Sequence, residues 1–186
     1  MMNFKKILCL ASLLLVTMPA AGSAADSKVI DLGAQLPQTP TELQPCRNPY
    51  DAAALSVAAF IRYTEDKAVG EAMLDKLKGP EPLSPFAKQF LRDRLLGKEY
   101  VARSYIEGTS PANAYAMQAP YRVTVYTNPY SFQEPHIAKL WLRSSGADSM
   151  RPITLREKAS TGEWFLWTYE GVLADIRPPK GASAWD

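Results

Sequence analysis

The one histidine of the 186-residue chain, His136, is the first residue to consider for chemistry. A serine hydrolase would place it beside a nucleophile such as Ser144 or Ser145 and an orienting acid such as Asp148. The chain has no G-x-S-x-G sequence, the turn that presents the nucleophile in one large class of hydrolases. We therefore interpret His136 as a loop residue between Pro135 and a following strand.

The sequence has few residues that could bind a metal, and its acids show no pattern that indicates a catalytic carboxylate pair. One histidine and, outside residues 1–25, one cysteine give none of the usual zinc ligand sets, and there is no D-x-[DN]-x-[DN]-G calcium loop. We therefore expect no metal and no cofactor. A hydrolase that uses paired carboxylates or His136 stays open as the second functional hypothesis. The acids that fall close together lie in a lysine-rich segment, which favours a solvated charged face: Glu65, Asp66, Glu71 and Asp75.

The polar turn RSSGADSMR, residues 143–151, is the most suggestive stretch for anion binding. Its hydroxyls, its glycine and its two arginines could surround an anion with backbone N–H groups. The structural alternative, which we favour, is a turn in which Asp148 caps local amides or pairs with Arg143 or Arg151. The candidate binding residues of this turn are Arg143, Ser145, Asp148 and Arg151.

The aromatic run WFLWTY, which begins at Trp164, is the strongest indication of a binding surface. Strand alternation places Phe165, Trp167 and Tyr169 on one face and Trp164 and Leu166 on the other. Core packing is the common role of such residues, but exposed aromatic patches bind flat molecules and mark interfaces. The candidates are Trp164, Trp167 and Tyr169, and the ligand that we expect is a small molecule, a glycan or a protein.

Helices precede strands along the chain. We expect Asn48 to cap a first helix, Thr64 to cap a second over residues 65–78, and Ser84 to cap a third that ends at Gly97. Apolar alternation then predicts strands at residues 100–106, 121–127, 137–143, 153–158 and 164–169. The fold class is α+β, with N-terminal helices packed on one face of a C-terminal antiparallel sheet of about five strands.

Arg94 falls within the apolar stripe of the third expected helix, between Phe90 and Leu91. An unpaired buried charge is costly, so we expect its guanidinium to reach a carboxylate or backbone carbonyls of the sheet or of a neighbouring helix and to fix the helix against the sheet. This role is structural, and the partners to consider first are Glu157, Glu170 and Asp175.

The first 25 residues have the pattern of a secretory signal peptide, with Lys5 and Lys6 before an apolar run and small residues after it. We expect cleavage between Ala24 and Asp26, and a soluble periplasmic or secreted protein. Cys9 lies inside the apolar run, so the chain has no lipid-attachment pattern. The domain boundaries that we expect are a signal peptide over 1–25, a Pro-rich extended arm over 26–47, a single α+β domain over 48–177 and a tail over 178–186.

Charge and cysteine content narrow the partners. Removing the two signal lysines from the 21 basic residues leaves 19, which equals the number of acidic residues. A neutral chain without a basic run argues against nucleic acid and against membrane association after signal cleavage. Cys46 then has no partner for an internal disulfide, and we interpret it as a small buried residue.

Four blocks carry a resemblance that covers nearly all of the expected domain. The chain resembles an uncharacterised family of exported bacterial proteins, described as a domain of unknown function. That resemblance implies one intact domain and, because the family has no assigned activity, no catalytic or binding residue. Our first functional hypothesis is therefore a non-enzymatic binding module that uses the aromatic sheet face. The blocks are NPYDAAAL (48–55), LKGPEPLSPFAKQFLRDRLLGKEYVARSYIEG (77–108), LRSSGADSMRPITLREK (142–158) and WFLWTYEGVLADIRPP (164–179).

Overall fold

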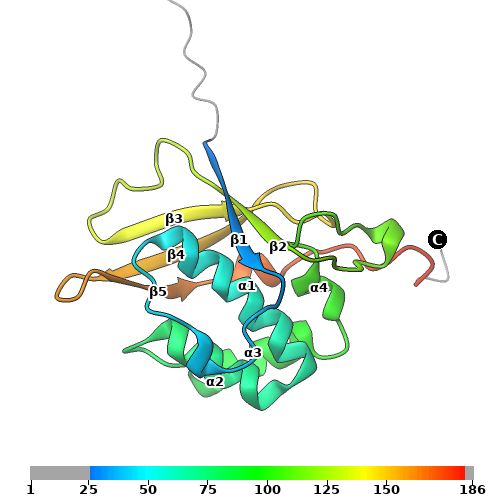
Figure 1. The fold of residues 1–186 in the computed structure, drawn as a ribbon, viewed down its shortest axis with the longest axis horizontal. Helices are drawn as coiled ribbons and strands as arrows, with labels where there is room; N and C mark the ends of the chain where they lie inside the picture. The colour runs from blue at the N-terminus through cyan, green and yellow to red at the C-terminus, as the bar shows by residue number, and fades with distance from the viewer. Residues whose placement is uncertain (1–25, 183–186) are drawn as a thin grey trace, which may run out of the picture.

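The structure is a computed structural model that describes residues 26–182. The predicted signal peptide, its cleavage point and the last residues of the predicted tail lie outside this range. The described chain forms a five-stranded antiparallel sheet in the order β1-β2-β3-β4-β5, with the helices gathered on one side of it (Figure 1). The predicted α+β class is confirmed.

The strands are β1 (Ser27–Gly33), β2 (Tyr121–Tyr126), β3 (Ile137–Leu142), β4 (Arg151–Lys158) and β5 (Glu163–Thr168). The α-helices are α1 (Pro49–Glu65), α2 (Lys67–Lys78), α3 (Pro85–Leu95) and α4 (Glu99–Arg103). Three short 3-10 helices complete the set: η1 (Pro40–Glu42), η2 (Pro111–Asn113) and η3 (Glu170–Leu173).

Helix α1 is the centre of the core. Asn48 caps it as predicted, because its side chain accepts the N–H of Asp51 at 3.0 Å. The helix contacts α2 and all five strands, which explains why it is apolar on both sides. A Cβ on Gly70 of α2 would lie 2.2 Å from the Tyr63 Cα, so the glycine allows the two helices to approach closely.

The predicted cap of the second helix is wrong. Thr64 remains inside α1, where its hydroxyl donates to the Ile61 carbonyl at 2.7 Å. Asp66 caps α2 instead, by accepting the Val69 N–H at 3.1 Å. The predicted cap of α3 is confirmed, since the Ser84 hydroxyl oxygen accepts from the N–H of its third residue.

The predicted strand over residues 100–106 is also wrong. This segment forms α4 and the turns that follow it. Its buried residues are spaced four apart as well as alternating, so a short apolar run of this kind fits a helix face equally well. The sheet still has five strands, because the segment predicted to be an extended arm contains β1, which pairs with β2.

The sheet has two different faces. Its inner face packs under α1 and carries the buried side chains of Val123, Val125, Leu140, Ile153, Leu155 and Leu166. The alternate residues point to the outer face, where Arg156 of β4 is the cross-strand neighbour of Phe165 of β5. The loop between α2 and α3 reaches this face, since a Cβ on Gly79 would lie 2.3 Å from Cδ1 of Phe165.

No helix within residues 26–182 has both the length and the apolar character needed to cross a membrane. The same residues contain no group of three or more His, Cys, Asp or Glu side chains placed to hold a metal ion.

Candidate functional site

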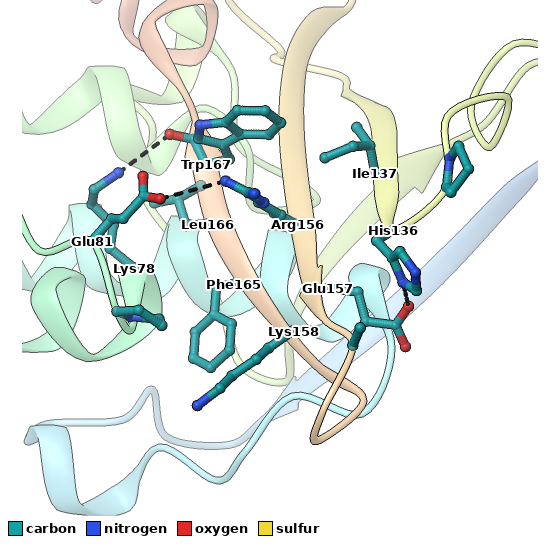
Figure 2. Close-up of a pocket in the computed structure, with 13 residues that line it drawn as sticks. Lys78, Glu81, His136, Ile137, Arg156, Glu157, Lys158, Phe165, Leu166 and Trp167 are labelled. Carbon is teal, nitrogen blue, oxygen red and sulfur yellow. Dashed lines mark hydrogen bonds and ion pairs between the residues drawn. The ribbon is translucent and has the colours of Figure 1, made fainter.

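The main cavity lies where the α2–α3 loop meets the outer face of β4 and β5, and Figure 2 shows its lining side chains. Its volume is about 600 Å³, a size suited to a small organic molecule. Pro80 lines it on the side of the α2–α3 loop, and Pro135 lines it from the segment before β3. We call this cavity the outer pocket.

Two aromatic side chains of β5 line the outer pocket. Phe165 is half-buried and Trp167 is 38% exposed. Trp167 is the extra residue of a β-bulge, since Leu166 pairs with Leu155 while Thr168 pairs with the adjacent Thr154. The bulge changes the direction of the chain at the pocket, and Trp167 and Phe165 both line it, with Arg156 between them in Figure 2.

Arg156 brings a cation to the aromatic lining. Its guanidinium carbon lies 4.9 Å from the centre of the Trp167 ring, within the range of a cation–π interaction. Its Nη1 lies 3.4 Å from Oε1 of Glu81, at the opposite side of the guanidinium in Figure 2. Lys78 and Lys158 also line the pocket, and Nζ of Lys78 donates to the Trp167 carbonyl at 3.3 Å.

Two carboxylates line the outer pocket, but they do not converge. Glu81 pairs with Arg156, whereas Glu157 contacts the opposite wall, where its Oε2 lies 2.9 Å from Nδ1 of His136. Figure 2 shows the two pairs on opposite sides of the cavity. Two acids that each hold a basic partner do not form the facing pair that glycoside hydrolysis needs.

His136 has an orienting acid but no nucleophile. Its backbone has a φ of 60°, and its ring is exposed next to Glu157. Within residues 26–182, no hydroxyl or thiol forms a hydrogen bond with this ring. The Ser144–Ser145 turn follows the opposite end of β3, and a strand of that length spans about 20 Å. The structure therefore does not bring His136 together with Ser144, Ser145 and Asp148 in a serine-hydrolase arrangement.

The first amides of the turn over residues 143–151 already donate to acceptors within the protein. The N–H of Ser145 donates to the Ser104 carbonyl at 2.9 Å, and that of Gly146 donates to the Ser144 hydroxyl at 3.0 Å. The Ser145 hydroxyl donates to the same Ser104 carbonyl at 3.1 Å. The turn is a structural connection between the loop after α4 and the sheet.

The charged residues of this turn also differ from expectation. Asp148 pairs with Arg177 at 3.0 Å rather than with Arg143 or Arg151. The guanidinium of Arg151 donates to the Asp175 carbonyl at 2.9 Å, and Arg143 is exposed. None of the turn's predicted binding residues lines the outer pocket.

The aromatic run divides differently from the predicted alternation. Tyr169 follows the end of β5 and is 2% exposed. The centre of its ring lies 5.4 Å from that of Phe60 and 6.4 Å from that of Phe90. Its predicted place on the same face as Phe165 and Trp167 is wrong, because the bulge at Trp167 reverses the alternation before Tyr169. Burial raises the pKa of its phenol. Trp164 lies at the other end of the strand, where its backbone N–H donates to the Cys46 carbonyl at 2.9 Å.

Arg94 does not fix α3 to the sheet. Its side chain is exposed and lies over the Phe90 ring, with 5.5 Å between the guanidinium carbon and the ring centre. The prediction that it is buried and paired with an acid is wrong. The apolar stripe of α3 is narrower than expected, since Leu91 and Leu95 are buried while Phe86 is 78% exposed.

The acids of the lysine-rich segment form local contacts. Glu71 lies 3.2 Å from Lys67 and 3.4 Å from Lys88, and Asp75 accepts the N–H of Leu83 at 2.7 Å. These contacts bind helices and loops to one another and do not line the outer pocket.

Sequence reasoning missed the polar residues of the outer pocket. The outer pocket takes these residues from two segments that are distant in sequence: Lys78 and Glu81 from the end of α2 and the loop after it, and Arg156 and Lys158 from β4. One signal was available: alternation from buried Ile153 and Leu155 places Arg156 and Lys158 on the outer face of β4. The register against Phe165 and the path of the α2–α3 loop have no such signal.

These features define an α+β protein with a half-open pocket that combines aromatic and cationic side chains on the outer face of its sheet. Residues 35–180 match a family described as a domain of unknown function (DUF6935), and the chain belongs to this family. This result confirms the resemblance to an uncharacterised family. Comparison with curated proteins and with solved structures found no match.

Proposed function

We propose that this chain is an exported, non-enzymatic protein that binds a small organic molecule in the outer pocket. The observation that carries the proposal is the aromatic lining, in which Trp167 is 38% exposed within a cavity of about 600 Å³. Concave, largely apolar sites with a few polar groups are the usual form of small-molecule sites. A flat sheet face without the α2–α3 loop would favour a protein partner or a glycan instead.

Binding of the neutral probe N-phenyl-1-naphthylamine tests this proposal, since its fluorescence rises in apolar surroundings. We expect saturable binding of one probe per chain, and we expect Trp167→Ala to weaken it about tenfold through loss of ring contact. The matched control is Trp141→Ala, because Trp141 lies on the same face of β3 but not in the outer pocket. Equal loss in both variants, or no saturable binding, would contradict the proposal.

Export is supported by the signal-peptide pattern of residues 1–25. We expect the exported protein to begin between Ala24 and Asp26, and intact-mass spectrometry of the exported fraction measures this. Exported material that keeps residues 1–20 would contradict signal cleavage.

A hydrolase is the second candidate, and the observation that favours it is the 2.9 Å contact between His136 and Glu157 in the pocket lining. An acid that orients a histidine is one half of a general-base arrangement, and water would have to be the nucleophile. The test is turnover of p-nitrophenyl acetate, with His136→Gln as the variant. Turnover that depends on His136 supports the hydrolase; turnover that the variant keeps removes it.

A further inference from the structure

We propose that the outer pocket selects ligands with a flat apolar body and one anionic group, such as a carboxylate, sulfonate or phosphate, and that Glu81 occupies the position of that group in the free protein. This inference rests on the proposed function, because it names the class of molecule that the same pocket binds.

The apolar half of the pocket suits a flat body. Phe165 and Trp167 supply two ring surfaces, and Ile137 lies on β3 directly across from Arg156. Aromatic rings prefer offset or edge-on contact with another ring, so a planar ligand gains more here than a globular one of equal area.

The charged half of the pocket is cationic once its internal pairs are considered. Lys78, Arg156 and Lys158 contribute three positive charges, and Lys158 follows Arg156 by two residues, so both leave the same face of β4. Oε2 of Glu157 lies 2.9 Å from Nδ1 of His136, so this carboxylate already has a partner at the edge of the pocket. Of the two acids in the lining, Glu81 is the one that an ion pair joins to a lining cation, Arg156.

The contact between Glu81 and Arg156 is easily replaced. It measures 3.4 Å, and the two side chains are 67% and 53% exposed, so solvent screens the attraction strongly. Glu81 stands in the loop between α2 and α3, where its side chain can turn away without moving either helix. A ligand carboxylate or sulfonate that meets the guanidinium with two oxygens forms a stronger contact, because the planar fork of arginine matches two acceptors.

The stacking of Arg156 on Trp167 supports this reading. The ring holds the guanidinium 4.9 Å from its centre, which restricts the rotamers of Arg156 before a ligand arrives. A cation fixed against the aromatic lining lets one ligand contact both at once, which reduces the entropy lost on binding.

A pair of probes that differ in one sulfonate tests the inference on the mature chain. These are 1-anilinonaphthalene-8-sulfonate and its neutral counterpart N-phenyl-1-naphthylamine, titrated by fluorescence and checked for one-to-one stoichiometry by calorimetry. We expect the sulfonate to bind about tenfold more tightly, as a charge-assisted contact allows. Added salt should weaken binding of the sulfonate probe and leave the affinity for the neutral probe unchanged.

Two variants with matched controls assign the difference to residues. Arg156→Met keeps the aliphatic packing and should weaken binding of the sulfonate probe about fivefold or more, by a larger factor than it weakens binding of the neutral probe. Glu81→Gln should raise the affinity for the sulfonate probe about threefold, since it removes the competing carboxylate without disturbing the core. The controls are Arg122→Met and Glu134→Gln, which remove ion-paired charges outside the pocket and should change neither probe.

The outcomes separate this inference from the proposed function. Equal affinities for the two probes, or a sulfonate affinity that Glu81→Gln lowers, would overturn the anionic ligand class while the pocket proposal stands. Failure of both probes to bind would overturn both. If Arg156→Met fails to fold by circular dichroism, the Glu81→Gln response still decides.

Discussion

The guanidinium carbon of Arg156 lies 4.9 Å from the centre of the Trp167 ring, although the cross-strand neighbour of Arg156 is Phe165. The contact depends on the bulge, which inserts Trp167 between two paired positions of β5. One local irregularity of the sheet therefore joins the cation of β4 to the aromatic lining of the outer pocket.

Replacing Arg156 should reveal this contact in the stability of the protein. We expect Arg156→Ala to lower the free energy of unfolding by about 0.5–1 kcal/mol, the value of an exposed cation–π contact. Urea titration followed by circular dichroism measures it. In a Trp167→Ala background the same substitution should cost close to nothing, and equal costs in the two backgrounds would show that the two side chains are not coupled.

Gly79 should tolerate no side chain. It caps the end of α2 with a φ of 61°, and a Cβ there would lie 2.3 Å from Cδ1 of Phe165. We expect Gly79→Ala to lower the free energy of unfolding by about 2 kcal/mol or more, from backbone strain and the clash together. Chemical denaturation measures the effect.

Gly97 provides the matched control for Gly79. Its φ is 70°, but a Cβ there would meet nothing within 4 Å, so Gly97→Ala should cost only about 1 kcal/mol for the backbone. Removing the ring with Phe165→Ala should bring the cost at Gly79 close to the cost at Gly97. If the two glycines respond alike in the wild-type background, the α2–α3 loop does not pack on Phe165 as described.

The α+β class could be predicted because its signals are local. Pro49 after Asn48 and Pro85 after Ser84 identify two helix starts, and alternation identifies β2 to β5. The error at residues 100–106 arose where helix and strand patterns coincide over a short run. The arm became β1 because β2 offered it an edge to pair with, which is a tertiary effect that propensity does not contain.

The outer pocket could be predicted only in part, for the same reason. Phe165 and Trp167 were recognisable as residues of a possible binding face, but a bulge shifts every later side chain to the other face of the strand, and Tyr169 became buried. Arg94 shows the opposite error: Phe86 is exposed, so the apolar stripe of α3 does not extend around the arginine.

Two buried tyrosines should respond differently to loss of the hydroxyl. The Tyr105 hydroxyl donates to the Val172 carbonyl at 2.6 Å, whereas the buried Tyr63 hydroxyl has no hydrogen-bond partner within residues 26–182. We expect Tyr105→Phe to lower the free energy of unfolding by about 1–2 kcal/mol, because a buried carbonyl loses its donor. Tyr63→Phe should leave it within about 0.5 kcal/mol or raise it. Urea titration compares the two, and a larger loss for Tyr63→Phe would mean that a partner or water satisfies its hydroxyl.

Cys46 should be chemically silent in the folded protein. Its side chain is 7% exposed, and burial, with smaller contributions from Asp51 and Glu163, raises the pKa of the thiol from 9.0 to about 11. The thiolate is the reactive form, so at pH 8 the native thiol should react with 5,5′-dithiobis(2-nitrobenzoic acid) at least about 100-fold more slowly than in guanidinium chloride. Because the folded pKa is the higher one, the contribution of this thiol to stability is complete below pH 9 and declines as the pH rises from 9 towards 11.

The backbone carbonyl of Cys46 accepts the backbone N–H of Trp164 at 2.9 Å. This hydrogen bond attaches the segment before α1 to the start of β5. Thiol reactivity therefore reports whether that segment opens. In protein that lacks residues 1–25, and with them Cys9, Cys46→Ala should abolish the absorbance change under both conditions. Rapid labelling of the native protein at pH 8, with the circular dichroism of the fold retained, would show that the segment leaves β5 without global unfolding and would contradict the closed packing described for this edge of the sheet.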